Sequence, residues 1–160
     1  MKDKIIDADR AAAIATELRE NGERLVFTNG CFDLLHVGHV RYLAAARALG
    51  DALIVAINGD ESVRALKGKG RPVNREAERA ELVAALESVD YVVIFPEVRA
   101  TTLLEKVRPA VYVKGGDYTA ATLDPDERAA LEHAGTEIRI LPFEPGYSTS
   151  RLVEKMRDLP

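Results

Sequence analysis

The chain has 160 residues, 47% hydrophobic and 30% charged, which is the size and balance of one folded domain and excludes a disordered chain. Its formal net charge is −4, with 22 basic and 26 acidic side chains, which argues against broad nucleic-acid binding because that requires a basic face. A single cysteine excludes an internal disulfide, and neither a membrane-length apolar run nor a secretory signal core is present, so we expect a cytoplasmic protein with no nucleic-acid or membrane partner.

Short apolar, β-branched runs alternate with helical stretches along the chain. Strands are predicted at 25–28, 53–57, 91–95, 111–113 and 138–141. Helices are predicted at 7–21, 39–49, 60–66, 75–87, 99–107, 125–133 and 149–156, with Asn74 as the N-cap of the fourth. This alternation predicts one doubly wound, Rossmann-like α/β domain over residues 1–160 with a five-stranded parallel sheet.

Polar, glycine-rich clusters follow several of the predicted strands. They are Asn29-Gly30, Asn58-Gly59-Asp60, Gly115-Gly116-Asp117 and the segment 146–150. The carboxyl ends of parallel strands share one edge of a sheet, and ligands of such sheets bind there, at the point where the strand order reverses. We therefore expect these clusters to converge on one binding site.

The segment from Thr28 to His39 carries the most specific signal. Two of the three histidines, His36 and His39, are three residues apart around Gly38. At a helix start these rings share a face, the glycine leaves room for a phosphate, and the helix terminus favours an anion. Two alternatives stay open: a metal site made by Cys31 with both histidines, and a purely structural pair of histidines.

Three further segments supply groups that bind phosphate or sugar. The glycine-rich loop 67–74 carries Lys67, Lys69 and Arg71, which can stabilise charge on a transferred phosphoryl group. Residues Ser148 to Ser150 offer hydroxyls and free N–H groups at a helix start. Lys114 can meet a phosphate and Asp117 a sugar hydroxyl. The alternatives are a solvated basic loop, an ordinary N-cap and a tight turn.

These motifs together resemble the nucleotidyltransferase superfamily with its His-x-Gly-His element, and most closely its heptose 1-phosphate adenylyltransferase branch. The resemblance rests on Phe27 to His39, Lys67 to Asn74, Val113 to Tyr118 and Gly146 to Arg151. It implies transfer of AMP from ATP to a sugar 1-phosphate, giving an ADP-sugar and pyrophosphate. It also implies Mg²⁺ carried by the ATP phosphates, a homodimer or higher homo-oligomer, and a free-standing form without the kinase domain that often accompanies this branch.

The resemblance assigns roles to individual residues. His36, His39 and Lys67 are expected to be catalytic. The expected nucleotide-binding residues are Asn29, Gly30, Cys31, Phe32, Asp33, Gly38, Ser148, Thr149 and Ser150. The expected substrate-binding residues are Asn58, Asp60, Arg71, Lys114, Gly115 and Asp117. No side chain is expected to bind a metal, although Asp33 could orient a ligand or the phosphate-bound ion. Arg79 matches an arginine of relatives, with a plain surface charge as the alternative.

Other functions fit the sequence less well. A cytidylyltransferase for glycerol 3-phosphate or a choline-type phosphate uses the same chemistry, but Phe143-Glu144-Pro145 stands where glycerol-phosphate enzymes carry an arginine. A non-catalytic nucleotide-binding regulator is disfavoured because the histidines, Lys67 and the serine-rich segment are intact. A dehydrogenase is disfavoured because no G-x-G-x-x-G follows the first predicted strand.

Overall fold

The computed structural model describes residues 1–116, 118–142 and 145–159. Within this part of the chain one sheet contains the strands β1 (Ile5–Ile6), β2 (Leu25–Gly30), β3 (Ala52–Asn58), β4 (Tyr91–Phe95), β5 (Val111–Gly115) and β6 (Glu137–Leu141). The helices are α1 (Ala8–Glu20), α2 (Val37–Arg47), α3 (Asp60–Lys67), α4 (Glu76–Ala84), α5 (Thr101–Val107), α6 (Pro125–Ala134) and α7 (Thr149–Arg157). The α/β class is confirmed, but in the described residues the sheet has six strands, not five.

The sheet is parallel in every pairing, with the strand order β1-β4-β3-β2-β5-β6. The additional strand, β1, is only two residues long and pairs with β4 through Ile5 and Ile6. From β2 the chain runs outward in one direction through β3 and β4, and later in the other direction through β5 and β6. The order therefore reverses beside β2, which makes the β2–β5 boundary the expected ligand crevice.

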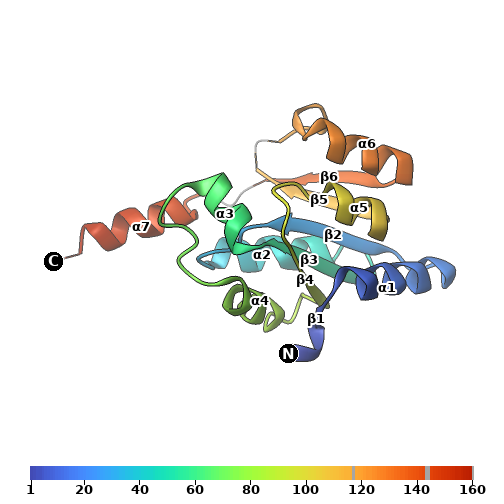
Figure 1. The fold of residues 1–160 in the computed structure, drawn as a ribbon, viewed down its shortest axis with the longest axis horizontal. Helices are drawn as coiled ribbons and strands as arrows, with labels where there is room; N and C mark the ends of the chain where they lie inside the picture. Colours follow the sequence, from blue (N-terminus) through green and yellow to red (C-terminus); the bar gives the residue numbers. More distant parts are fainter. Residues whose placement is uncertain (117, 143–144, 160) are drawn as a thin grey trace.

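Helices cover both faces of the sheet (Figure 1). On one face, Phe27, Ile54 and Tyr112 pack in the core cluster that contains residues of α1, α5 and α6. On the other face, Leu53 and Val55 pack in the cluster that contains residues of α2 and α4. Because successive strand residues point to opposite faces, β3 is apolar in almost every position and buried along its whole length.

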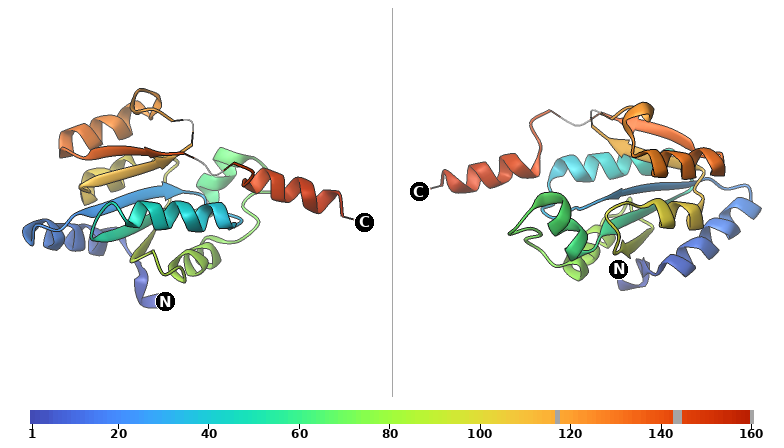
Figure 2. Two further views of the ribbon diagram at one scale, coloured as in Figure 1. Left: turned by 180° about the vertical axis from the view of Figure 1, so that it is seen from behind. Right: turned by 45° about the horizontal axis from the view of Figure 1, so that its top comes forward.

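The C-terminal helix α7 differs from the other helices. It projects from one end of the molecule in all views, and none of its described residues is buried (Figures 1 and 2). None of the helices in the described part of the chain combines the length and hydropathy needed to cross a bilayer.

Candidate active site

The two motif histidines sit together at the start of α2. His36 is the N-cap residue and His39 is the third residue of the helix, and their ring centroids lie 3.9 Å apart at an interplanar angle of 29°. The backbone N–H of His36 donates to Nδ1 of His39 over 3.3 Å. Because Nδ1 accepts, the neutral ring of His39 carries its proton on Nε2 and is a donor at that atom.

Both histidines are held neutral near pH 7. Burial lowers the pKa of His39 to about 4, and the nearby charge of His36 acts in the same direction. Burial also lowers the pKa of His36. Nδ1 of His36 is buried and has no hydrogen-bond partner among the described residues. A buried polar atom without a partner is costly, so this position suits a ligand that supplies one.

Gly38 lies where a larger residue does not fit. A Cβ at this position would stand 2.9 Å from the His36 ring and 2.9 Å from Cβ of Tyr147. The Tyr147 ring stacks beside His36 at 6.4 Å, and the guanidinium of Arg41 lies 5.7 Å from the centre of the Tyr147 ring. The start of α2 therefore meets the segment before α7, as the sequence predicted for its glycine-rich clusters.

The start of α7 reaches the same end of the sheet. The side-chain oxygen of Ser148 accepts from the N–H of Arg151 over 3.1 Å, which makes Ser148 the N-cap. The Thr149 hydroxyl donates to the carbonyl of Leu34, in the loop before α2, over 3.4 Å. The N-cap that was the alternative for this segment is thus present, and the segment also lies close to the histidine segment, as the expected convergence requires.

The carboxylate of Asp33 is hydrogen-bonded to other residues of the protein. Its buried carboxylate accepts from the backbone N–H of Val73 and Asn74, each at 2.9 Å, and from the Arg71 guanidinium at 2.7 Å. Burial alone raises the pKa of Asp33, but these donors outweigh burial and lower it. Asn74 also donates from its side chain to the Asp33 carbonyl at 2.8 Å. The predicted N-cap role of Asn74 is wrong, because Arg75 occupies that position.

The contacts of Asp33 divide the basic loop into two halves. Arg71 and the residues after it are fastened beside β2, whereas Lys67 ends α3 and Lys69 lies exposed in the loop. Gly68 and Gly70 have φ values of 94° and 90°, which only glycine adopts readily. The free half of the loop carries the lysines, and the fixed half carries an arginine that is already paired.

Arg79 is the residue whose position the sequence did not determine. Its side chain is 0% exposed on α4 and donates to the Cys31 carbonyl at 2.7 Å and the Asn74 carbonyl at 3.1 Å. It also pairs with Asp60 at 2.9 Å. One buried guanidinium thus joins the ends of β2 and β3 to the basic loop. A surface arginine produces the same sequence pattern, so only the match to relatives pointed to it.

The expected sugar-binding side chains after β3 also have internal partners. Asp60 accepts from the N–H of Glu76 at 2.8 Å besides binding Arg79. The Asn58 side chain is buried and donates to the carbonyls of Glu97 at 3.3 Å and Val98 at 3.4 Å. These contacts tie the loops after β3 and β4 together at the edge of the sheet.

The ends of β2 and β5 adjoin at the crevice. Asn29 accepts from the hydroxyl of Tyr112 at 2.8 Å, and Gly30 is the last residue of β2. Phe32, just beyond, has a φ of 48°, an uncommon value for a side-chain-bearing residue that often marks functional segments. Gly115 ends β5, beside Lys114. Asp117 lies outside the described residues, as do Phe143 and Glu144.

Cys31 and the histidines do not make a metal centre. The Cys31 thiol is half-buried, its pKa is raised by burial, and its Sγ lies 4.0 Å from Oδ1 of Asn58. Across the residues that the structure describes, no three His, Cys, Asp or Glu side chains are grouped to hold a metal ion.

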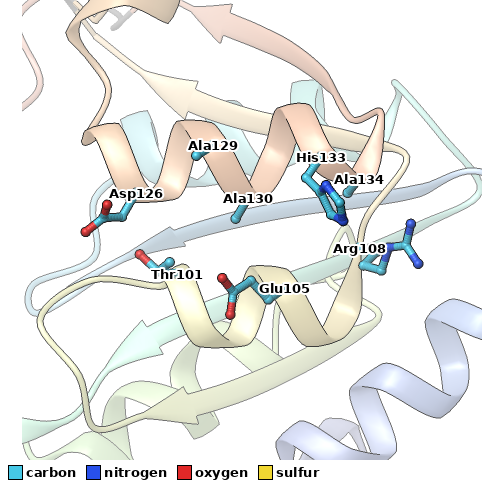
Figure 3. A pocket seen from close by; sticks show the side chains of 8 residues that line it. All are labelled: Thr101, Glu105, Arg108, Asp126, Ala129, Ala130, His133 and Ala134. Carbon is cyan, nitrogen blue, oxygen red and sulfur yellow. The ribbon is translucent and has the colours of Figure 1, made fainter.

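A separate surface hollow lies between α5 and α6 (Figure 3). It has a volume of about 500 Å³, and its lining residues include three alanines of α6, Glu105, Asp126, Arg108 and the third histidine, His133. None of its lining residues belongs to the predicted site.

Known proteins resemble this chain over most of its length. A sequence profile of the cytidylyltransferase-like family matches residues 27–155. Bifunctional protein HldE of Geotalea uraniireducens (strain Rf4) is 51% identical over 154 residues, which are 96% of this chain and 31% of that protein. Bifunctional protein HldE of Methylococcus capsulatus is 55% identical over 141 residues, 88% of this chain and 30% of that protein. The chain thus spans about a third of the length of these relatives.

Two solved structures share the fold. The lipopolysaccharide core biosynthesis protein from Thermoplasma volcanium GSS1 has a TM-score of 0.63 and 27% identity, covering 77% of this chain and 98% of that one. Pantoate-beta-alanine ligase from Francisella tularensis has a TM-score of 0.58 and 15% identity, covering 91% of this chain and 68% of that one, which indicates a common fold.

Proposed function

The chain belongs to the cytidylyltransferase-like family of nucleotidyltransferases, and from this premise we propose that it transfers AMP from ATP to a sugar 1-phosphate. The preferred acceptor is D-glycero-β-D-manno-heptose 1-phosphate, and the products are ADP-heptose and pyrophosphate. The identity of about half of all residues with the HldE proteins supports this choice. The structural neighbour from Thermoplasma, a lipopolysaccharide core biosynthesis protein, supports a sugar acceptor.

The chemistry requires positioning and charge stabilisation. An oxygen of the acceptor phosphate forms a bond to the α-phosphorus of ATP, and the bond from that phosphorus to the bridging oxygen of the pyrophosphate breaks. The electron pair leaves with pyrophosphate. The acceptor oxygen is already anionic near neutral pH, so no general base and no covalent enzyme intermediate are needed.

The histidine pair is the observation that carries the proposal. Two neutral imidazoles stack at a helix N-terminus, with Nε2–H of His39 available as a donor and Nδ1 of His36 lacking a partner in the described residues. A donor that is fixed in this way, as Nε2–H of His39 is, stabilises phosphate oxygens without reorganising during the reaction. In the proposal His36 and His39 bind the triphosphate and the pentavalent phosphorus.

The remaining roles are those that the resemblance to the family implies. Lys67 neutralises the α-phosphate, Ser148 to Ser150 bind the departing pyrophosphate, and Lys114 faces the acceptor. The triphosphate oxygens would hold Mg²⁺, which would neutralise part of their charge, while the carboxylate of Asp33 is paired with protein donors. We further propose that residues 1–160 form one domain and that the protein acts in the cytoplasm as a homodimer or higher homo-oligomer.

The test is pyrophosphate release in the presence of Mg²⁺, with ATP and CTP each combined with heptose 1-phosphate, glycerol 3-phosphate and phosphocholine. We expect release with ATP and heptose 1-phosphate only. Release with CTP and a polyol phosphate would replace the proposal with a cytidylyltransferase, to which the family name itself points. The absence of pyrophosphate release in every combination would overturn the proposed catalytic activity.

A histidine series tests the role of the pair. His39→Ala should lower turnover by about a hundredfold or more, because a donor to the transition state is lost, while the protein stays folded. His133→Ala is the matched control, since this histidine lies on α6 at the separate hollow. Turnover of His39→Ala within a few-fold of the wild type would exclude the assigned role.

A further inference from the structure

Two cations, Lys114 in β5 and Arg99 in the loop after β4, lie toward the carboxyl edge of the sheet. Lys114 is next to the last residue of β5, at the crevice where the strand order reverses. Arg99 lies in the loop between β4 and α5 and is exposed. Neither Arg99 nor Tyr118, which follows β5, was assigned a role from the sequence.

Lys114 is a partly buried ammonium that pairs with no carboxylate among the residues that the structure describes. Its Nζ instead lies 5.0 Å from the centre of the Tyr118 ring. Burial lowers the pKa of Lys114, and the charges of Arg99 and Lys67 lower it further, while Glu127 and Cys31 oppose them. A desolvated cation of this kind suits an anionic ligand, because the ligand returns the stabilisation that burial removed.

The neighbouring acidic groups have other partners. Glu127 is buried and accepts from the backbone N–H of Ala100 at 2.8 Å. Asp124 caps α6 and lies 3.3 Å from Nε of Arg99, which orients the guanidinium while more than half of its side chain stays exposed. Two further cations, Arg99 and Lys67, act on Lys114 beside these two carboxylates, which are already hydrogen-bonded or paired.

We propose that Lys114 and Arg99 bind the phosphate of the acceptor and that the exposed ring of Tyr118 covers the face of its sugar. This rests on the proposed function, and it divides the site into two parts. The histidine pair and Lys67 serve the nucleotide, and the loops after β4 and β5 select the acceptor. A guanidinium binds a phosphate through two parallel hydrogen bonds, and an aromatic ring packs against the C–H face of a sugar.

Steady-state kinetics of Arg99→Ala separate the two parts. Loss of a charge-assisted contact should raise KM for heptose 1-phosphate roughly tenfold to a hundredfold and leave KM for ATP within about twofold. Arg128→Ala is the control, because this exposed arginine on α6 pairs with Glu132 away from the crevice. Equal changes in both KM values, or an unchanged acceptor KM, would overturn the assignment of Arg99.

Tyr118 is tested by a pair of variants. Tyr118→Ala should raise the acceptor KM about threefold to tenfold, whereas Tyr118→Phe should stay near the wild type because it retains the ring face. If Tyr118→Phe were as impaired as Tyr118→Ala, the hydroxyl and not the ring face would be what matters, and the proposed contact would be wrong.

Equilibrium binding of heptose 1-phosphate tests the acceptor site independently of turnover. Heptose 1-phosphate is titrated into the wild-type chain and into Arg99→Ala, each loaded with a non-hydrolysable ATP analogue and Mg²⁺. Binding to the wild type that weakens at least about tenfold in Arg99→Ala supports the acceptor site even if no turnover is seen. Equal binding to both proteins, or none to the wild type, overturns it.

Discussion

Arg79 shows how one buried charge organises a site that it does not itself form. A guanidinium with no exposed surface is stable only when its donors are paired, and here they are divided between two backbone carbonyls and Asp60. Each partner belongs to a different segment at the carboxyl edge of the sheet. The cost of burying the charge therefore fixes the relative positions of those segments.

Removing the Arg79 side chain should strongly destabilise the folded protein. Arg79→Ala removes the guanidinium that pairs with Asp60 and donates to two carbonyls, and it opens a cavity, so we expect a loss of about 3–5 kcal/mol in the free energy of unfolding. Urea denaturation followed by circular dichroism measures this. Arg75→Ala, at the exposed N-cap of the same helix, should change stability by less than about 0.5 kcal/mol. Similar values for the two variants would refute the buried role.

The histidines and Asp33 show which side-chain contacts could be predicted from the sequence and which could not. The stacking of His36 and His39 follows from their spacing at a helix start, and the structure brings them together as expected. Asp33 stays a predicted ligand-orienting residue, and the structure adds that its carboxylate accepts from Arg71, Val73 and Asn74. Nothing in the local sequence predicts these contacts, because the partners lie about forty residues away along the chain.

At the scale of elements, prediction succeeded where a pattern was long enough to repeat. The five longer strands were located from apolar β-branched runs, and β3 shows why, since both of its faces are covered. β1 was missed because Ile5-Ile6 is too short to show any periodicity. It becomes a strand only through its pairing with β4, more than eighty residues later in the chain.

Helix α7 contacts the candidate site at its first residues and is otherwise unburied. Its first residues contact the loop before α2, while none of its described side chains is buried. A nine-residue helix with so little packing is marginal in water. A segment of this kind has a low opening free energy, and a ligand at its N-terminus would stabilise it.

Hydrogen exchange tests this property of α7. Without ligand, its amides should show protection factors below about 10, whereas those of β3 should be protected by several orders of magnitude. Saturating ATP with Mg²⁺ should slow exchange in α7 severalfold, because phosphate contacts order the segment from Ser148 to Ser150. Protection of α7 equal to that of α2 in the free protein, or no response to ATP, would contradict this expectation.

For the whole molecule, the parallel sheet explains why residues scattered along the sequence share one site. Strand ends that carry Asn29, Asn58 and Lys114 necessarily meet at one edge once all strands run in the same direction. The convergence could therefore be predicted from the sequence. The approach of the Tyr118 ring to the partly buried Lys114 could not, because it is a tertiary property.

The stability of the whole chain should depend on pH through the same site. The pKa of His39 is about 4 in the folded protein, against 6.5 as the ordinary value, so between these values the unfolded chain binds more protons. Stability is therefore complete above about pH 6.5 and falls as the pH decreases toward 4. Asp33 does not interfere in this window. Its lowered pKa keeps it ionised, and its contribution disappears only at more acidic pH.

Urea unfolding at pH 7.5 and pH 5.0 measures this dependence. The wild type should lose on the order of 2 kcal/mol between the two pH values through His39. His39→Asn should lose much less, since its amide oxygen can replace Nδ1 as the acceptor for the N–H of His36 but does not titrate. His133→Asn should behave like the wild type. Equal losses in the wild type and His39→Asn would show that the buried imidazole does not control acid stability, and the neutral histidine pair on which the phosphate site depends would lose its support.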